Sequence, residues 1–482
     1  MTEHSLPTQV ENPKLTLYAF HLCHDIATDE GKRVEDSEHL WQTFETLGQA
    51  LGIESLATCR YWLNLPENGG MVPFRELLSE EIGRCLRFPI PFAETQPVTP
   101  QCRRNGELYA LQLHDTYAAD LTFRYTGIVS IDQLTDLNPH GKLLSNQIQP
   151  SLGQTLVLFA KPVSNGEFLQ TESLKLLAEN CVTALLKEAD KNLPSPVYIA
   201  EGKLLGSPIF EYDNFAEDPA QSCHILIWLN CHDDTAKLEA DAGYYHSLFN
   251  LLCCRHKMRF SYHQARERNR DARAISNQLE NKVKALENLP GNVSERLNVL
   301  KQSFLETTPK TFIYSSYLRD IEDHRTAIIT NFKNYNTALK QLNKIEGENE
   351  LSFLQSFDNQ SRKYLAQIRT DLNYLKPGET LFGHCIATMR GIVEVEQAEM
   401  NDKRQQADKD LQDHIQGIGV GIAAGAIVAS NTGLITQPWK MPWSNQRSSI
   451  PHPFFIALCL SVLCSWGAWQ IAKQRIKKRR FN

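Results

Sequence analysis

The chain has 482 residues, of which 22% are charged, and a formal net charge of −6 at pH 7. This length gives room for two or three domains, and the acidic balance argues against a protein that binds nucleic acid. The twelve cysteines include no Cys-x-x-Cys pair, which favours reduced structural thiols over a zinc site or a disulfide framework.

The first 234 residues are predicted to form a cytosolic α/β domain. Runs of apolar and β-branched residues predict strands at 15–22, 107–113, 120–125, 155–160 and 223–229. Apolar residues at helical spacing predict helices at 40–51 and 174–185. The second and third strands are expected to form a hairpin around residues 115–119.

One tripeptide occurs twice, each time after a predicted strand. Phe20-His-Leu-Cys-His-Asp25 and Trp228-Leu-Asn-Cys-His-Asp233 both end in Cys-His-Asp. One interpretation is a paired site at the ends of two adjacent strands for a divalent cation or another ligand, because thiolate, imidazole and carboxylate groups bind metals. The other is a chance match, or two βα units whose polar residues cap the next helix. The candidate ligands are Cys23, His24, Asp25, Cys231, His232 and Asp233.

Residues 235–378 are predicted to be a helical, coiled-coil region. Pro290-Gly291, Pro309 and Pro377-Gly378 are expected to end successive helices. Between Leu318 and Leu342, apolar residues recur at alternating steps of three and four. This pattern is typical of coiled coils, so we expect the helical region to associate into a homo-oligomer.

Residues 379–414 are predicted to be a juxtamembrane stalk helix. No helix breaker stronger than glycine occurs between Glu379 and Gln437, so the stalk is expected to continue into the next segment as one helix. The part from 394 to 413 is mostly acidic and polar. It is either a solvated spacer or, when several copies stand around an axis, the wall of an acidic funnel that gathers cations.

Two segments near the C-terminus have the character of transmembrane helices. Residues 415–436 and 453–472 contain no charged side chain, and each is close to the roughly 20 residues that cross a bilayer. The basic tail at 473–482 predicts a cytosolic C-terminus in contact with membrane lipids. The start of the chain lacks the features of a signal peptide, so a cytosolic N-terminus and an external loop at 437–452 are also expected. The anchoring residues are Lys473, Arg475, Lys477, Lys478, Arg479 and Arg480.

The two apolar segments differ in kind. Gly417, Gly421 and Gly425 share one face of the first segment at steps of four, where helices approach closely. Asn431 adds a polar group toward its outer end. The second segment is bulky and contains Trp466 and Trp469, which suit a lipid interface. Two interpretations stay open, a packed two-helix anchor and an oligomeric pore lined by the first segment.

The order of these parts resembles the CorA-type magnesium-channel superfamily. An N-terminal cytosolic α/β domain precedes long helices, a stalk leads into the first of two C-terminal spans, and a basic tail follows. The resemblance implies an α+β chain with a funnel-forming stalk and a C-terminal two-helix transmembrane hairpin. The family carries Gly-Met-Asn at the outer end of the first span. Here that place reads Ser430-Asn431-Thr432, so only the asparagine corresponds.

These patterns lead to two functional hypotheses. The first is an oligomeric CorA-like channel or membrane effector, gated when its cytosolic domain senses a small molecule or a protein. The second is a non-conducting, membrane-tethered scaffold that binds a partner through its coiled-coil helices. The sequence has no P-loop, G-x-S-x-G, HExxH or dinucleotide-binding glycine motif. No enzyme or tightly bound cofactor is therefore predicted, although an unfamiliar activity in the N-terminal domain stays open.

Overall fold

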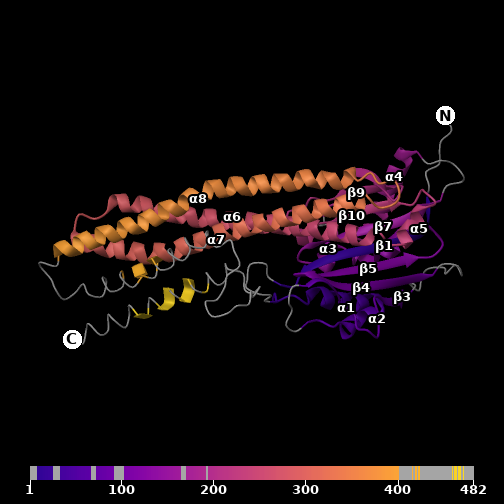
Figure 1. Cartoon of the computed structure of the whole chain (residues 1–482), viewed down its shortest axis with the longest axis horizontal. Coiled ribbons are helices and arrows are strands. Elements are labelled where there is room, and N and C mark those ends of the chain that lie inside the picture. Colours follow the sequence, from indigo (N-terminus) through magenta and orange to yellow (C-terminus); the bar gives the residue numbers. More distant parts are fainter. Residues whose placement is uncertain are drawn as a thin grey trace, which may run out of the picture. The chain divides into compact units, whose positions relative to one another are not determined.

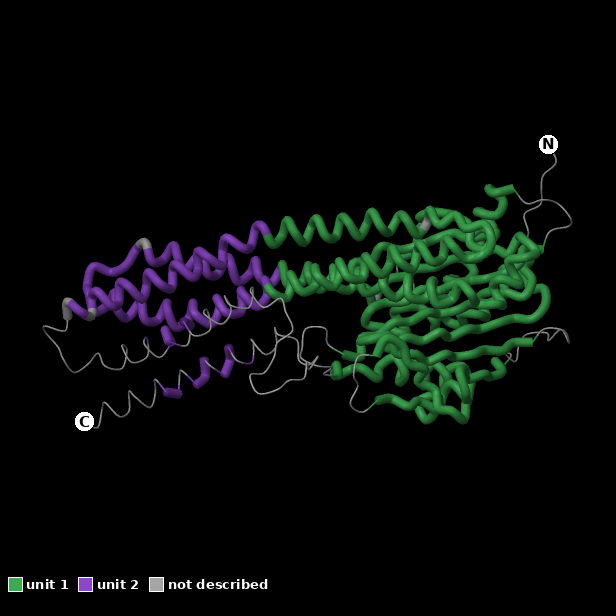
Figure 2. Tube along the Cα trace, in the orientation of Figure 1, with its two compact units in different colours: residues 1–269, 319–372 green, residues 270–318, 373–482 purple. Residues whose placement is uncertain are grey.

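The computed structural model describes residues 8–24, 33–66, 72–91, 103–163, 170–190 and 194–400, together with short pieces between 415 and 471. It has a mixed α+β architecture with one large sheet and several long helices (Figure 1). The chain divides into two compact units, which are distinguished by colour in Figure 2. Unit 1 contains residues 1–269 and 319–372, and unit 2 contains residues 270–318 and 373–482.

The sheet belongs to unit 1 and follows the order β2-β4-β5-β1-β7-β10-β9-β8, with β3 beside β4 and β6 beside β1. Every described pair is antiparallel except β7 and β10, which run parallel. The strands are β1 (Gln9–Leu22), β2 (Val72–Glu76), β3 (Leu86–Pro89), β4 (Arg104–His114), β5 (Thr116–Tyr125), β6 (Ile128–Ser130), β7 (Gly153–Pro162), β8 (Val197–Leu204), β9 (Ser207–Asp213) and β10 (His224–Leu229).

The helices fall into a short group and a long group. The short α-helices are α1 (His39–Leu51), α2 (Glu54–Ala57), α3 (Ser145–Ile148), α4 (Thr171–Leu185) and α5 (Thr235–Ala240). The long helices are α6 (Tyr245–Ala285), α7 (Val293–Leu342) and α8 (Ser352–Met400). Short 3₁₀-helices are η2 (Cys59–Trp62), η3 (Ile131–Leu137), η4 (Pro139–Gly141), η5 (Pro219–Gln221) and η6 (Leu286–Asn288).

The two faces of the sheet have different partners because side chains alternate along each strand. On β7, Leu156 and Leu158 join a large apolar core with residues of α1 and α4. Thr155 points to the opposite face, where its hydroxyl contacts His256 of α6. Residues 245–269 of α6 therefore cover the second face of the sheet within unit 1.

The strands predicted from sequence at 15–22, 107–113, 120–125, 155–160 and 223–229 are confirmed as parts of β1, β4, β5, β7 and β10. The predicted hairpin is also confirmed, and it turns tightly at Asp115 between β4 and β5. The strands β2, β3, β6, β8 and β9 were not predicted. In β9, Glu211 and Asp213 are both buried, and two acidic residues conceal the apolar pattern that identifies a buried strand.

Two predicted helix ends are wrong. The break at Pro290-Gly291 is confirmed, since α6 and α7 lie on either side of it, but Pro309 lies inside α7 and Pro377 inside α8. A proline in a helix interior costs about 3 kcal/mol, so both helices continue in spite of this cost. Next to Pro377, a Cβ on Gly378 would lie 2.8 Å from the Tyr314 hydroxyl. This hydroxyl donates a hydrogen bond to the Leu375 carbonyl. Glycine thus lets Tyr314 approach the helix.

The prediction of one unbroken helix from Glu379 to Gln437 is also wrong. The structure describes α8 as far as Met400, and the next described residue, Ile415, lies in one apolar cluster with Met389, Val393 and residues of α7. In a continuous helix, Ile415 would lie more than roughly 30 Å along the axis from Val393, at 1.5 Å per residue. Ile415 therefore does not continue the line of α8.

The stripe from Leu318 to Leu342 is buried within the chain. Ile321, Ile328 and Tyr335 are at most 1% exposed, and the Tyr335 hydroxyl donates to the Leu354 carbonyl of α8 at 2.7 Å. This spacing therefore reflects packing of helices from one chain, and it is no evidence for self-association.

Among the residues that the structure describes, no helix combines the length and apolar character needed to cross a bilayer. The predictions for the first segment's glycine face, Asn431, the loop at 437–452 and the basic tail fall on residues outside the described ranges. The same holds for Asp25. The residues concerned are Gly417, Gly421, Gly425, Asn431, Lys473, Arg475, Lys477, Lys478, Arg479 and Arg480.

Candidate functional site

A cavity of about 1010 Å³ opens in unit 1 at the carboxyl ends of β7 and β10. We call it the β7–β10 pocket. Because these strands are parallel, their carboxyl ends meet at the same edge of the sheet, which is where open α/β sheets bind ligands. Its lining includes Glu11, Phe159, Lys161, Leu174, Glu201, Lys203, Phe210, Asn230, Cys231, His232, Asp233, Glu348, Glu350 and Ser352.

The second Cys-His-Asp triplet forms part of this pocket. Cys231, His232 and Asp233 follow β10 after one intervening residue, Asn230, and all three are exposed and line the cavity. The backbone N–H of Cys231 donates to Ser207 Oγ at 3.0 Å, which fixes the turn after the strand. Although the Cys231 side chain is exposed, the surrounding atoms desolvate it and raise the pKa of its thiol to about 11. The thiol is therefore neutral at physiological pH.

The first triplet lies at the opposite end of the sheet. Phe20 of β1 pairs with Gly153 at the start of β7, whereas Leu229 of β10 pairs with Ala160 near its end. The described residues Cys23 and His24 are thus a strand's length from Cys231, and β7 separates β1 from β10. The hypothesis of one paired site on adjacent strands does not fit this register.

Cys23 and His24 are buried instead in the core of unit 1. Burial is the main cause that raises the pKa of the Cys23 thiol to about 12 and lowers the pKa of His24. Within the described ranges, no three histidine, cysteine or acidic side chains are grouped so as to hold a metal ion.

The acidic side chains of the β7–β10 pocket outnumber its basic ones. Lys161 lies 3.6 Å from Glu11, and Lys203 lies 3.0 Å from Glu348. These pairs leave Glu201, Glu350 and Asp233 without a lysine of the pocket as partner, so the cavity has a negative potential. The pocket thus favours a ligand with a positive charge.

Asn230 provides an unused polar group at the pocket. Its backbone N–H donates to the Ala160 carbonyl at 2.8 Å, which ties the end of β10 to β7. Its side chain is 9% exposed, and its Oδ1 atom has no hydrogen-bond partner in the structure. A buried acceptor without a partner costs about 1–3 kcal/mol, so a donor group on a ligand would relieve this cost.

The pocket wall is fastened to the start of α8. The β8–β9 hairpin turns at Leu205-Gly206, and both backbone N–H groups donate to residues 348–349. Lys203 and Glu350 exchange backbone hydrogen bonds of 2.8 and 2.9 Å. Ser352, the first residue of α8, donates from its hydroxyl to the Glu201 carbonyl at 2.9 Å. Hydrogen bonds therefore join the pocket wall to the residues at and just before the start of α8.

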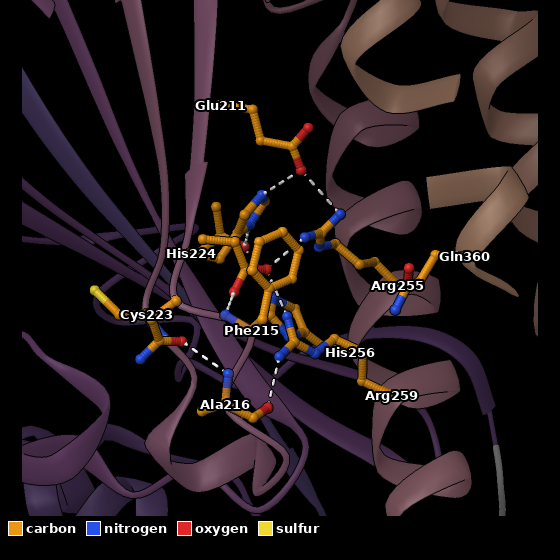
Figure 3. Close-up of polar contacts among 12 residues, drawn as sticks. Glu211, Phe215, Ala216, Cys223, His224, Arg255, His256, Arg259 and Gln360 are labelled. Atoms are coloured by element: carbon orange, nitrogen blue, oxygen red, sulfur yellow. Dashed lines mark hydrogen bonds and ion pairs between the residues drawn. The ribbon is translucent and has the colours of Figure 1, made fainter. Parts of the chain in front are cut away.

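A second polar group of unit 1 lies beneath α6, and we call it the α6 ion cluster (Figure 3). Asp213 of β9 accepts from Arg255 at 2.7 Å and from Arg259 at 2.5 Å. Glu211 lies 3.0 Å from Arg255 and 3.1 Å from Nε2 of His224. The cluster consists of Thr155, Glu211, Asp213, His224, Arg255, His256 and Arg259.

The Thr155 hydroxyl joins two histidines of this cluster. It lies 2.8 Å from Nδ1 of His224 and 2.8 Å from Nε2 of His256. Gly153 makes room for His256, because a Cβ on Gly153, whose φ is +120°, would lie 2.6 Å from Nδ1 of the ring. The hydroxyl thus accepts from one ring and donates to the other.

The electrostatics of the α6 ion cluster follow from its burial. Burial favours a higher pKa for Asp213, but Arg259 and Arg255 outweigh it and hold the pKa of this carboxyl below its ordinary value. Burial, followed by the charge of Arg255, lowers the pKa of His224, and burial followed by His224 lowers the pKa of His256. Asp213 is therefore ionised at neutral pH, and both rings are neutral.

No residue of the α6 ion cluster is more than 9% exposed, so a ligand from solvent does not reach it. The cluster joins α6 to the sheet. Sequence reasoning missed it, although two signals were present. Glu211 and Asp213 have strand spacing, and Arg255 and Arg259 have helical spacing in an apolar stretch. Each pair places charges on one face of its element.

The sequence matches no protein-family model and no curated protein.

Proposed function

We propose that this chain is an oligomeric membrane effector of the CorA-like kind. In this proposal a ligand binds in the β7–β10 pocket and changes conduction through a path lined by residues 415–436. The absence of charged side chains from 415–436 and 453–472 supports the membrane part of the proposal. The observation that carries it is the link between the pocket and α8, because the chain passes from α8 to the first apolar segment.

The chemistry of the pocket suggests the class of ligand. Its volume of about 1010 Å³ lies at the upper end of small-molecule sites, which span roughly 300–1,000 Å³. Phe159 and Phe210 give apolar surface, while Glu201, Glu350 and Asp233 favour a positive charge. These features fit an organic molecule with a cationic group.

Reconstitution in liposomes with a measurement of ion flux tests conduction. Gly421→Leu is expected to block flux or prevent assembly, because a bulky side chain on the glycine face meets either a neighbouring helix or the path. Leu458→Ala on the bulky second segment is the control and should conduct as wild type. Asn431→Leu should change ion preference without changing the amount of assembled protein. Unaltered flux in both first-segment variants would show that another helix lines the path.

A disulfide tests gating without knowledge of the ligand. Lys203 and Glu350 form a hydrogen-bonded antiparallel pair, whose Cα atoms lie about 5.5 Å apart, within the range that a disulfide spans. Oxidised Lys203→Cys/Glu350→Cys protein should conduct differently from the reduced protein, because the bond locks the pocket wall to α8. Lys203→Cys alone is the control. Equal flux in both redox states would refute gating by this wall and leave conduction intact.

The second candidate is the non-conducting tether. The departure from Gly-Met-Asn at Ser430-Asn431-Thr432 favours it, because this place selects the ion in the family that the chain resembles. If liposomes with wild-type protein show no flux for any ion tested, with or without small molecules extracted from cytosol, the tether is the better description.

A further inference from the structure

Unit 1 has a second cavity whose charge is opposite to that of the β7–β10 pocket. It measures about 520 Å³ and lies over β3, β4 and β5. Four arginines contribute to it, namely Arg87, Arg103, Arg104 and Arg124, together with Asn105 and Glu107. We call it the arginine groove.

Strand register places Arg87, Glu107 and Arg124 on one face of the sheet. Arg87 of β3 pairs with Glu107 of β4, and Asn105 of β4 pairs with Arg124 of β5. Residues 105 and 107 point to the same side because side chains alternate along a strand. The opposite side carries Phe88 and Phe123 of the apolar core. Arg87 and Arg124 are thus held side by side on a rigid floor.

The arginines exceed the carboxylates near them. Glu107 is shared by two guanidinium groups, since it pairs with Arg124 and lies 3.9 Å from Arg87. Arg104 pairs with Asp136 at 2.7 Å. Within the described part of the chain, Arg103 has no acidic partner, and its carbonyl accepts from the Thr126 N–H at 2.9 Å, which fixes its backbone. The Arg104 guanidinium is buried with Asp136, so three guanidinium groups, those of Arg87, Arg103 and Arg124, remain for the single carboxylate of Glu107.

We propose that the arginine groove binds a compact anion with several phosphate groups, such as inorganic triphosphate or the phosphates of a nucleotide. Guanidinium groups match phosphate oxygens with paired hydrogen bonds, and the shared Glu107 leaves Arg87 and Arg124 with unused donors. Among the described residues that line the groove, Phe88 has the one aromatic ring, and it is 3% exposed. Bases of a nucleic acid strand would therefore find no stacking surface there, which favours a small anion.

Calorimetric titration of the full chain in detergent with inorganic triphosphate tests the proposal. Arg103→Gln/Arg124→Gln should weaken binding at least tenfold. Lys187→Gln/Arg362→Gln removes two positive charges from unit 1 outside the groove and should bind as wild type. Both variants should melt near the wild-type temperature because these side chains are exposed or half-buried. If the double variant does not fold, Arg103→Gln alone should still weaken binding several-fold.

Vesicles of phosphatidylcholine with one-fifth phosphatidylinositol phosphate distinguish the source of the phosphate. Binding of free triphosphate that depends on Arg103 and Arg124 supports the proposal and identifies a soluble ligand. If only the vesicles bind, and the same variant loses binding, the phosphate belongs to a lipid headgroup. The proposal is overturned if wild type binds neither probe, or if both double variants bind equally well.

Discussion

The α6 ion cluster and the β7–β10 pocket take residues from the same strands, but charges are buried and paired in the cluster and exposed and partly unpaired in the pocket. In the cluster, Asp213 meets two guanidinium groups away from water. In the pocket, Glu350 and Asp233 are exposed and no lysine of the pocket neutralises them. Matched buried charges hold elements together, whereas unmatched charges at an open strand end are available to a ligand. The comparison predicts that the cluster determines stability and the pocket determines binding.

The largest expected effect is on the α6 ion cluster. Asp213→Ala leaves Arg255 and Arg259 without their shared carboxylate, and breaking a buried pair in this way costs about 3–5 kcal/mol. Urea denaturation should show this loss in the free energy of unfolding. Asp234→Ala is the control, because Asp234 forms only an exposed pair with Lys237. Equal losses in the two variants would contradict the difference between the two regions.

Cys231 tests whether the wall of the pocket is desolvated. With a thiol pKa of about 11, native Cys231 should react with iodoacetamide at pH 8 on the order of a hundredfold more slowly than an ordinary thiol, because only the thiolate attacks. Mass spectrometry of the Cys231 peptide gives the rate, and the chain unfolded in urea is the control. A native rate equal to the unfolded rate would mean that solvent surrounds the thiol.

Acidification should weaken the fold through the two histidines of the cluster. The pKa values of His224 and His256 lie below their ordinary values in the folded state, so the unfolded chain binds more protons below about pH 6.5. Stability is then complete above that pH and is lost as the pH falls. Asp120 acts in the opposite direction, because burial raises the pKa of its carboxyl to about 6.

The measurement is the urea midpoint at pH 7.5, 6.5 and 5.5, which we expect to fall steadily. His224→Gln should reduce this slope, whereas His140→Gln on the surface should not. A midpoint that rises on acidification would show that Asp120 outweighs both rings.

The smallest expected effect concerns an exposed pair of the pocket. A double-mutant cycle on Lys203 and Glu348 should give a coupling free energy of about 0.2–1 kcal/mol, because water screens their attraction. The same cycle on Arg255 and Asp213 should give a larger value. Similar coupling free energies in the two cycles would mean that the exposed pair of the pocket is as strong as the buried pair of the cluster, which would contradict the comparison.

Local patterns were sufficient to predict much of unit 1. The apolar run of β7 and the hairpin at Asp115 could be recognised because each depends on neighbours in the sequence. Cys231 was identified as a candidate ligand from its tripeptide alone. Its pocket partners Lys203 and Glu350 were not, because only strand register and the return of the chain before α8 bring them together.

The helical region shows what the spacing of apolar residues cannot predict, namely which helix packs against them. The stripe that contains Ile328 and Tyr335 follows coiled-coil spacing, and that spacing is the same whether the partner helix belongs to the same chain or to another. The hydrogen bond from Tyr335 to Leu354 shows that the partner is α8 of the same chain. One sequence without its contacts could not distinguish these two cases.

Gly153 has a practical consequence for saturation mutagenesis of this chain. Its φ of +120° and its closeness to His256 exclude every other side chain, so position 153 should tolerate no substitution. Asn230 and Glu201 in the pocket should tolerate many in an assay of protein abundance alone. A map of abundance would therefore rank Gly153 above the residues that we expect to contact a ligand. Only a second map, scored by flux, would identify the pocket.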